Sequence, residues 1–453
     1  MLYESESGDI TMAFTGDAMI CGALMPFREE RFLKIRDLLH GADVRFTNGE
    51  MLFHNYEDCP TYLTGTYMRC DPRFLKDLEW MGINLMACAN NHGYDFGENG
   101  VLTNLRNLEE ARMVHAGSGS NYAEAVAPAY LQTAKGRVAL ISVTTSGRAN
   151  SRAGEQRRDV KGRPGVNLVR WISEWTVDAQ AFEAMKRIAE QFEWKQRVDP
   201  IWIRPYGLEE ESSDHAIYFP DRNALGVNTE DPAARFVLGT SFERHTRLHR
   251  RDFERNLQSV REARRMADWV VYSIHSHEGG KSEEDPSEHV RTLAHAAIDA
   301  GVDIVTGQGL HRNRGIEIYK GKPIFYSLGN FIKQNNSVPR MPHDNMVHYG
   351  LGHENTPADF YDARVASTRK EESVSSLSWR SAVSVATFQG KKLREIKLHP
   401  IELGFGLSRS QAGRPVMAQG TAAREILERF QRLSEPFQTK IDIQGEIGVI
   451  RVE

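Results

Sequence analysis

Polar side chains with metal-binding chemistry recur directly after short apolar runs of this 453-residue chain. They are Asp17 after Met12–Thr15, Asn48 and Glu50 after Val44–Phe46, Asn90, Asn91 and His92 after Asn84–Ala89, His275 and His277 at the end of Trp269–Ile274, and His311 after Val302–Thr306. Open α/β sheets bind their ligands at such strand ends. Carboxylate, amide and imidazole ligands without thiolate suit Mn, Zn, Fe or Ca, so the set predicts a divalent metal site.

The string His275-Ser276-His277 is the sharpest of these signals, because the period of two residues in a strand puts both imidazoles on one face. Each position alone has a simpler explanation. An Asp after a strand is commonly a turn or cap residue, and a lone His is commonly hydrogen-bonded within the protein. Five clusters in one chain are harder to explain by turns, so we favour the metal site.

Alternating strands and helices must position these side chains, which is the pattern of a layered α/β domain. The expected strands are Ile10–Thr15, Val44–Asn48, Asn84–Ala89, Val138–Val143, Trp269–His275, Val302–Thr306 and Ile324–Leu328. The expected amphipathic helices are Arg28–Leu39, Pro72–Met81, Gly100–Ala111, Asp252–Ala267 and Ser287–Ala300. A C-terminal group, Ala382–Gln389, Leu393–Pro400 and a helix around Ala422–Leu433, is expected to continue the same domain.

Two irregular stretches interrupt this pattern. Gly147–Phe242 is expected to be an insertion over the sheet edge, with one amphipathic helix near Asp178–Phe192, and Gln334–Glu372 to be a lid-like loop. The insertion begins with a cluster of basic residues: Arg148, Arg152, Arg157, Arg158, Lys161 and Arg163. Guanidinium groups bind carboxylates in bidentate fashion, so Arg157 and Arg158 are candidates for holding a substrate carboxylate, with a solvated loop as the equal alternative.

Charge and composition restrict the partners. The chain has 57 Lys and Arg against 61 Asp and Glu, a net charge of −4, so no global field draws it to nucleic acid or membrane. No apolar stretch approaches the roughly 20 residues of a spanning helix. The four cysteines, Cys21, Cys59, Cys70 and Cys88, show no Cys-x-x-Cys spacing. We therefore expect a cytoplasmic protein that binds a small molecule or peptide, and its assembly as a homo-oligomer stays open.

Several strings resemble the capsule-synthesis (poly-γ-glutamate) protein family and follow its order. They are Phe14-Thr-Gly-Asp17, Asn48-Gly-Glu50, Ala89-Asn-Asn-His-Gly-Tyr-Asp95-Phe-Gly-Glu98, Asp303-Ile-Val-Thr-Gly307 and Tyr326-Ser-Leu-Gly-Asn-Phe331. That family is similar in fold to the calcineurin-like metallophosphoesterases. The resemblance implies a four-layer α/β/β/α sandwich over residues 1–146 and 243–453, with 147–242 as an insertion or lid over the site.

The resemblance also implies roles for individual residues. Asp17 would be the first metal carboxylate, Glu50 would stand where related phosphoesterases have a bridging Asp, and Asn91, His275 and His311 would be further ligands. His92 would be the nearby acid or base, and His277 could compensate for missing ligands.

Two imidazoles of the phosphoesterase pattern are absent. Met19 and Gly309 stand where phosphoesterases have His, and Leu310 replaces the usual proline. Because each ion of a two-metal centre needs several protein ligands, we expect one ion rather than two.

Three functions follow as hypotheses. The first is a metal-assisted hydrolase of an amide or peptide-like carboxylated substrate, γ-glutamyl compounds included, with Asp17, His92 and His277 catalytic and Asn90 beside the substrate. An amide substrate is favoured over a phosphoester. The second is a peptide epimerase that uses the same site. The third is a non-catalytic component of poly-γ-glutamate or capsule synthesis.

Overall fold

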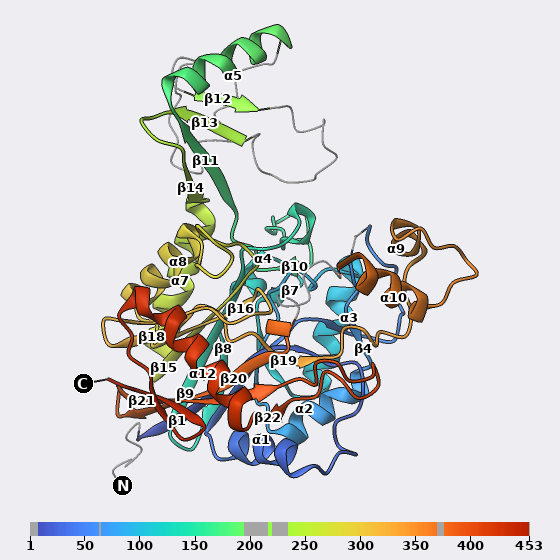
Figure 1. The fold of residues 1–453 in the computed structure, drawn as a ribbon, viewed down its shortest axis with the longest axis vertical. Helices are drawn as coiled ribbons and strands as arrows, with labels where there is room; N and C mark the ends of the chain where they lie inside the picture. The colour runs from blue at the N-terminus through green and yellow to red at the C-terminus, as the bar shows by residue number, and fades with distance from the viewer. Residues whose placement is uncertain (1–7, 63–64, 194–215, 220–233, 369–375, 453) are drawn as a thin grey trace.

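Two β-sheets form the body of the protein in the computed structural model, which describes residues 8–62, 65–193, 216–219, 234–368 and 376–452 (Figure 1). The ten-stranded sheet has the order β23-β24-β21-β20-β1-β2-β5-β6, with β19 also paired to β1 and β22 to β21. Its strands are β1 (Ile10–Met19), β2 (Val44–Gly49), β5 (Leu85–Ala87), β6 (Val114–Ala116), β19 (Asn330–Lys333), β20 (Arg380–Gln389), β21 (Lys392–Glu402), β22 (Val416–Met417), β23 (Asp442–Gln444) and β24 (Ile447–Arg451). In this sheet β2, β5, β6 and β19 run parallel to β1.

The six-stranded sheet has the order β17-β18-β16-β15-β9-β8. Its strands are β8 (Ala129–Thr133), β9 (Gly136–Thr144), β15 (Trp269–Ser276), β16 (Ile304–Gly309), β17 (Ile316–Tyr319) and β18 (Lys322–Phe325). The four central strands β9, β15, β16 and β18 are parallel, and β15 is buried along its whole length. Parallel strands of this kind are apolar on both faces because both faces are covered.

A shared apolar core joins the two sheets. Phe14 of β1 and Phe325 of β18 lie with ring centroids 6.0 Å apart, and the fully buried Trp269 belongs to the same cluster. Helix α12 (Gly420–Ser434) adds Leu427 and Phe430 to this core. Close packing of both sheets around large side chains fixes their relative position, and with it the strand ends that carry the polar residues.

Helices cover the outer faces. On the ten-stranded sheet, α1 (Glu30–His40) and α2 (Leu75–Met81) bury residues such as Phe32 and Leu78. On the six-stranded sheet, α7 (Arg250–Met266) and α8 (Glu288–Ala300) bury Val260 and Leu293. The body also contains the longer helix α3 (Gly97–Glu110) and several short elements: α4 (Tyr122–Ala125), β3 (Leu52–Phe53), β4 (Arg69–Cys70), β7 (Ser118–Gly119), β10 (Gly165–Val166) and the 3₁₀ turns Pro72–Phe74, Ala149–Ser151 and Glu435–Phe437. The expected α/β class is confirmed.

The expected strands are present, but β1 and β18 end at other residues than the sequence predicted. Strand β1 runs on to Met19, so Asp17 lies inside the strand and not after it. The expected strand Ile324–Leu328 was wrong in extent: β18 ends at Phe325, and Gly329 turns the chain at φ +79° before β19. The Gly329 carbonyl then accepts a hydrogen bond from the backbone N–H of Asp17 (3.0 Å). This contact ties the turn to the site strand.

The expected irregular loop Gln334–Glu372 was also wrong over much of its length. It contains α9 (His343–His348) and α10 (Pro357–Thr368), while residues 369–372 lie outside the described part of the chain. Among the side chains of α10 that the structure describes, Phe360 and Tyr361 are the buried ones. A helix that buries two adjacent residues shows no stripe at three- and four-residue spacing, so the periodicity of the sequence did not reveal it.

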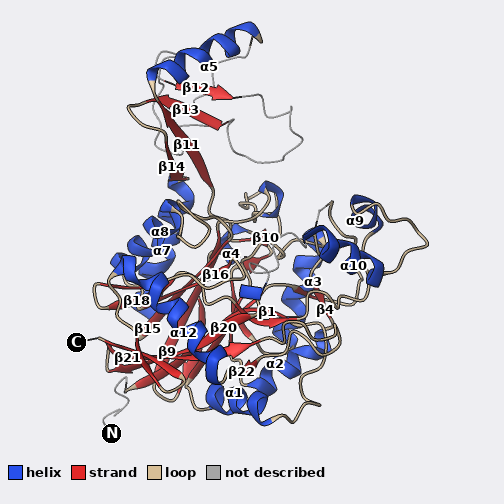
Figure 2. Cartoon of the chain, viewed as in Figure 1, coloured by secondary structure: helices blue, strands red, loops and turns tan. Residues whose placement is uncertain are grey.

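The insertion forms a small sheet of its own that stands away from the body (Figures 1 and 2). Its described elements are β11 (Trp171–Val177), β12 (Ala216–Phe219), β13 (Ala234–Leu238), β14 (Glu243–Leu248) and helix α5 (Ala179–Gln191). The helix was expected, and the sheet was missed because β14 reads Glu-Arg-His-Thr-Arg-Leu, which lacks the apolar alternation of a half-buried strand. Arg235 and Glu174 form a buried ion pair inside this sheet.

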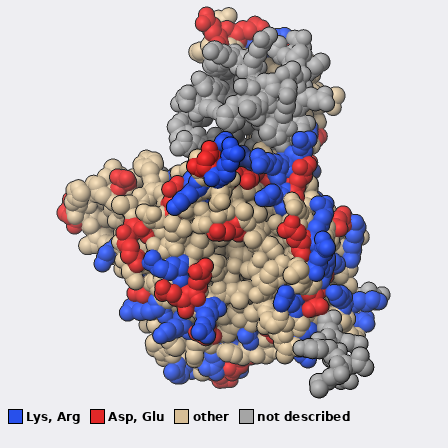
Figure 3. Space-filling model, turned by 180° about the vertical axis from the view of Figure 1, so that it is seen from behind, with Lys and Arg blue, Asp and Glu red and all other residues tan. Residues whose placement is uncertain are grey.

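Charged side chains of both signs are interspersed on the face of the molecule drawn in Figure 3. In the part of the chain that the structure describes, no helix combines the length and apolar character needed to cross a membrane.

A buried carboxylate ties the start of the insertion to the body. Asp252, in the first turn of α7, accepts hydrogen bonds from Arg170 at 2.7 and 3.0 Å and from Arg152 at 3.1 Å, and it has no exposed surface. Burial opposes ionisation of Asp252, but the hydrogen bond and charge of Arg170 and the charge of Arg152 outweigh it and lower its pKa. Arg152 is therefore structural, although it belongs to the basic cluster.

We expect Asp252→Ala to destabilise the protein by about 3 kcal/mol, since removing one partner of a buried ion pair leaves the other charges without compensation. The lower end of the usual range applies because the Arg170 side chain keeps 22% of its exposure and can recover some hydration. Denaturant unfolding measures the change. Asp299→Ala, which removes the exposed partner of Lys320, is the control and should leave stability nearly unchanged. Equal effects of the two variants would contradict this account.

Candidate metal centre

Three fully buried residues form the floor of the candidate site: Asp17 of β1, Glu50 directly after β2, and His275 of β15. They come from both sheets. Parallel strands present their carboxyl ends at one edge, and the packing of the sheets brings the ends of β1, β2 and β15 together. The five sequence clusters therefore do meet in space, as the following contacts show.

Asp17 is a fully satisfied carboxylate. Its Oδ1 accepts a hydrogen bond from Asn48 Nδ2 (2.7 Å), and its Oδ2 accepts one from the backbone N–H of Gly309 (3.0 Å). Burial opposes ionisation, but the neighbouring imidazoles of His275 and His311 outweigh it, so the pKa of Asp17 lies below its ordinary value. Asp17 is therefore a stable negative charge at the bottom of the site.

Glu50 is the opposite case. Both of its carboxylate oxygens are buried and have no hydrogen-bond partner. Imidazole nitrogens surround it at longer range: Oε2 lies 3.6 Å from His311 Nδ1, and Oε1 lies 3.8 Å from His275 Nε2 and 3.9 Å from His92 Nε2. Burial, with the charges of Asp17 and Asp95, holds the pKa of Glu50 well above its ordinary value. A buried carboxylate without donors needs a cation or a proton.

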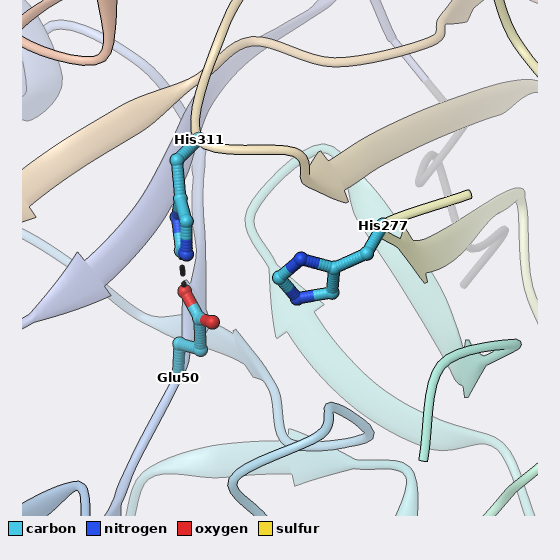
Figure 4. A group of neighbouring side chains, drawn as sticks. All are labelled: Glu50, His277 and His311. Atoms are coloured by element: carbon cyan, nitrogen blue, oxygen red, sulfur yellow. Dashed lines mark ion pairs between the residues drawn. The ribbon is translucent and has the colours of Figure 1, made fainter. Parts of the chain in front are cut away.

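Half-buried side chains form the rim of the site: Asn91, His92, His277 and His311. Glu50, His277 and His311 each offer a ligand atom, and these atoms lie within 4.8 Å of one another. Figure 4 shows the three side chains turned toward a common space, with His311 paired to Glu50 and His277 facing them from the end of its strand. This geometry fits a divalent ion bound by one carboxylate and two imidazoles.

His275 and His277 lie as the period of the strand predicts. Their Nε2 atoms are 3.2 Å apart, and His275 Nε2 is also 2.8 Å from Asn91 Oδ1. Burial and the charges of His275 and His311 hold the pKa of His277 well below its ordinary value. A neutral imidazole keeps the lone pair that metal binding or proton transfer requires.

Hydrogen bonds behind the rim hold the imidazoles in place. The backbone N–H of His277 donates to Ser146 Oγ (2.7 Å), and Ser146 in turn donates to Glu278 Oε1 (2.8 Å). His311 Nδ1 lies 2.9 Å from Asn330 Oδ1. His311 has φ +61°, a strained conformation for a residue with a side chain, and such strain is characteristic of functional sites.

His92 and Asp95 form a dyad at the rim. His92 Nδ1 is 2.7 Å from Asp95 Oδ2, which also accepts a hydrogen bond from the backbone N–H of Met68 (2.8 Å). An N–H at Nδ1 that points to a carboxylate leaves the lone pair on Nε2, the atom nearest Glu50. Asn90 has a structural place here: it is fully buried and binds the Gly49 carbonyl and the backbone N–H of His92.

The two missing imidazoles have physical explanations. Met19 is buried in the same apolar cluster as residues of α1, so this position contributes to the core and not to metal binding. Gly309 has φ +111°, and a Cβ there would lie 2.8–2.9 Å from the backbone of Ser276. A side chain at this position would push β16 away from β15, and the Gly309 N–H would lose Asp17.

The structure places Arg157 and Arg158 on the exposed surface of the insertion. Arg157 pairs with Asp159 at 3.0 Å, so a local carboxylate already compensates its charge. Arg163 donates to the carbonyl of Arg152. Carboxylate recognition by Arg157 and Arg158 stays a prediction.

Two residues near the site, Asp95 and Lys333, had no assigned role in the sequence analysis; Asn48 was among the candidate ligands, and Asn330 was expected to hold the turn beneath the site. Asn48, Asp95 and Asn330 lie within the family strings, and Asn48 stands two residues before Glu50, which is the spacing of one strand face. Their partners could not be read from the sequence. Asn48 Nδ2 lies 3.2 Å from His275 Nδ1, a contact between residues 227 positions apart.

Comparisons with known proteins show which family the chain resembles over most of its length. The family described as "Bacterial capsule synthesis protein PGA_cap" matches residues 11–335. The uncharacterized proteins y4uA and y4sH of Sinorhizobium fredii (strain NBRC 101917 / NGR234) are each 34% identical over 459 residues, which covers 98% of this chain and 93% of each relative. The "PGA biosynthesis protein CapA" of Bacillus subtilis (strain 168) is 39% identical over 118 residues, 25% of this chain and 30% of that protein. With the family match spanning the strands that carry Asp17, Glu50, His277 and His311, this chain belongs to the bacterial capsule synthesis protein family.

Proposed function

We propose that this protein is a metal-assisted hydrolase that cleaves an amide bond in a peptide-like, carboxylated compound, with γ-glutamyl compounds as the first candidates. The observation that carries the proposal is the Glu50 carboxylate, buried without a hydrogen-bond partner and surrounded by three imidazoles. The relative named for PGA biosynthesis supports a glutamyl substrate class.

The layers of the fold support a metal-dependent reaction. Helices on the outer face of each sheet and one core between the sheets agree with the four-layer α/β/β/α sandwich of the metallophosphoesterase type. In this proposal residues 147–170, the part of the insertion next to the body, border the site.

Glu50, His277 and His311 would hold the ion, with Asp17, Asn91 and His275 beside it. A bound divalent ion supplies Lewis acidity, which polarises a carbonyl group and makes water a stronger acid at neutral pH. Asp17 keeps a negative charge at the floor, which favours a cation there. His92 moves the proton: Asp95 fixes its Nδ1 as a donor, so Nε2 is free to accept a proton on the side of Glu50 and return it to the leaving amine.

The deciding experiment is a parallel screen of the protein loaded with Mn or Zn against γ-linked diglutamate peptides and generic phosphoesters. Release of free glutamate would support the proposal. Exchange of the α-proton for deuterium without cleavage would identify an epimerase instead. If the protein catalyses neither reaction but forms a stable complex with capsule-synthesis enzymes, it is a non-catalytic component.

We expect purified protein to bind about one divalent ion per chain, because the three ligand atoms converge on one space while Met19 and Gly309 contribute no imidazole. Elemental analysis after metal-supplemented expression measures the content. Glu50→Gln and His277→Ala should each lose the ion. His295→Ala is the matched control, because His295 of α8 pairs with Glu317 of β17 and is not a candidate ligand. This variant should keep the ion. Two tightly held ions, or none, would contradict the prediction.

Phosphomonoesters and phosphodiesters should be poor substrates, turned over more slowly than about one per second. In-line displacement at phosphorus in two-metal enzymes relies on ions at both the attacking and the leaving oxygen, and we expect this site to hold one. A colorimetric assay with added Mn tests this. Turnover at ordinary enzyme rates would overturn the preference for amides.

Asp95→Asn should lower kcat by about ten- to a hundredfold, as is usual when the partner that orients a functional imidazole is lost. The amide keeps the volume of the carboxylate but stabilises the other tautomer of His92. Metal content should not change, and the double variant His92→Ala/Asp95→Asn should be no slower than His92→Ala alone. Additive losses would show that Asp95 acts independently of His92.

A further inference from the structure

Lys333 ends strand β19 next to the candidate metal centre. In the parallel pairing of β19 with β1, Lys333 lies opposite Met19, and Ile332 lies opposite Ala18. On the other side of β1, the backbone N–H of Glu50 donates to the carbonyl of Ala18 (3.3 Å). Lys333 and Glu50 therefore flank the same strand end, one on each side.

Specific contacts hold the Lys333 ammonium in place. They involve a hydroxyl group and an aromatic ring, and hydrogen bonds connect them to the rim of the site. Its Nζ donates to Ser378 Oγ and lies 4.8 Å from the ring centroid of Trp379. The carbonyl of Ser378 accepts a hydrogen bond from Asn330 Nδ2 (2.7 Å), and Asn330 is the partner of His311 Nδ1. The lysine is thus connected to the rim of the site through two residues, and its side chain is half-buried.

The charge of Lys333 is not compensated by an ion pair within the described residues. Lys34, Lys320, Lys322 and Lys397 each pair with a carboxylate, whereas no carboxylate of the described residues forms an ion pair with Lys333. Burial and the charge of Arg364 lower the pKa of Lys333 to about 7, Glu50 acts against this, and Arg312 adds to it. A half-buried cation near other cations attracts an anion from solution.

We propose that Lys333 is the residue that binds a carboxylate of the substrate. This inference rests on the proposed function and deepens it: the substrate would carry its carboxylate within reach of one lysine, close to the amide that is cleaved. One ammonium beside the acidic Glu50 suits a singly charged carboxylate better than a phosphate dianion, whose two charges call for several donors and cations.

The test is equilibrium binding of glutarate and of its uncharged analogue glutaramide, by calorimetry, to the protein with and without Mn. The wild type should prefer glutarate. Lys333→Gln should lose about ten- to a hundredfold of that preference, the usual contribution of one charge-assisted contact, while Lys333→Arg should keep most of it. Metal content, measured on the same samples, should be equal in all three proteins.

Two further variants sharpen the result. Lys397→Gln removes the same charge from β21, where Lys397 pairs with Glu395, and should keep the wild-type preference. The double variant Arg157→Ala/Arg158→Ala tests the rival assignment, in which these two arginines hold the substrate carboxylate; it should keep the preference for glutarate. The inference is overturned if the wild type does not prefer glutarate, if inorganic phosphate binds more tightly than glutarate, or if the preference survives in Lys333→Gln. Absence of metal from every protein would count against the proposed function alone, because the glutarate preference of the metal-free protein still reports on Lys333.

Discussion

The structure depends on the burial of two carboxylates, Asp17 and Glu50, at one point between two sheets. Desolvation makes each negative charge costly, and their proximity adds to that cost. The protein compensates only one of them, since Asp17 has an amide and a backbone N–H as donors while Glu50 has neither. Although burial opposes it, the imidazoles of His275 and His311 lower the pKa of Asp17, whereas burial and the charges of Asp17 and Asp95 raise that of Glu50. A folded chain keeps such an arrangement where a ligand completes it, and a divalent cation is the ligand that matches the donors on the rim.

That constraint reaches into the backbone. The Gly309 N–H can donate to Asp17 only because β16 lies close against β15, and this closeness leaves no room for a Cβ at position 309. His311, two residues later, adopts φ +61° so that its ring turns back toward Glu50 and Asn330. The position where the resemblance to phosphoesterases would place an imidazole therefore donates a backbone hydrogen bond to Asp17. The close approach of β16 to β15 thus has two effects: it excludes a ligand side chain at position 309, and it provides a hydrogen bond to Asp17.

Much of this site could be predicted from the sequence, because strand ends and period-two spacing are local properties. His275 and His277 lie on one side as their spacing predicts, and Asp17, Glu50, Asn91, His92 and His311 come together. Contacts that depend on tertiary packing were not readable. The strand pairing that puts Lys333 beside Met19 joins residues over 300 positions apart, and the sheet of the insertion is made of strands with too many charges to show alternation. Helix α10 was missed for the related reason that its buried side chains, among those described, are two adjacent rings.

The balance of charge at the site bears on the substrate. The floor carries one firm negative charge on Asp17 and a second that appears on Glu50 when a cation binds, so one divalent ion leaves the floor near neutrality. If the site holds one ion, as we propose, a phosphoester would bring one or two further negative charges without a second ion to meet them. An amide is uncharged at the reacting carbon, and a carboxylate elsewhere in the same molecule can be met at a distance from the ion by a single cation. In the function we propose, an acidic floor with a cation across the end of β1 suits a carboxylated amide better than a phosphoester, and the same packing that holds Glu50 away from water creates this arrangement.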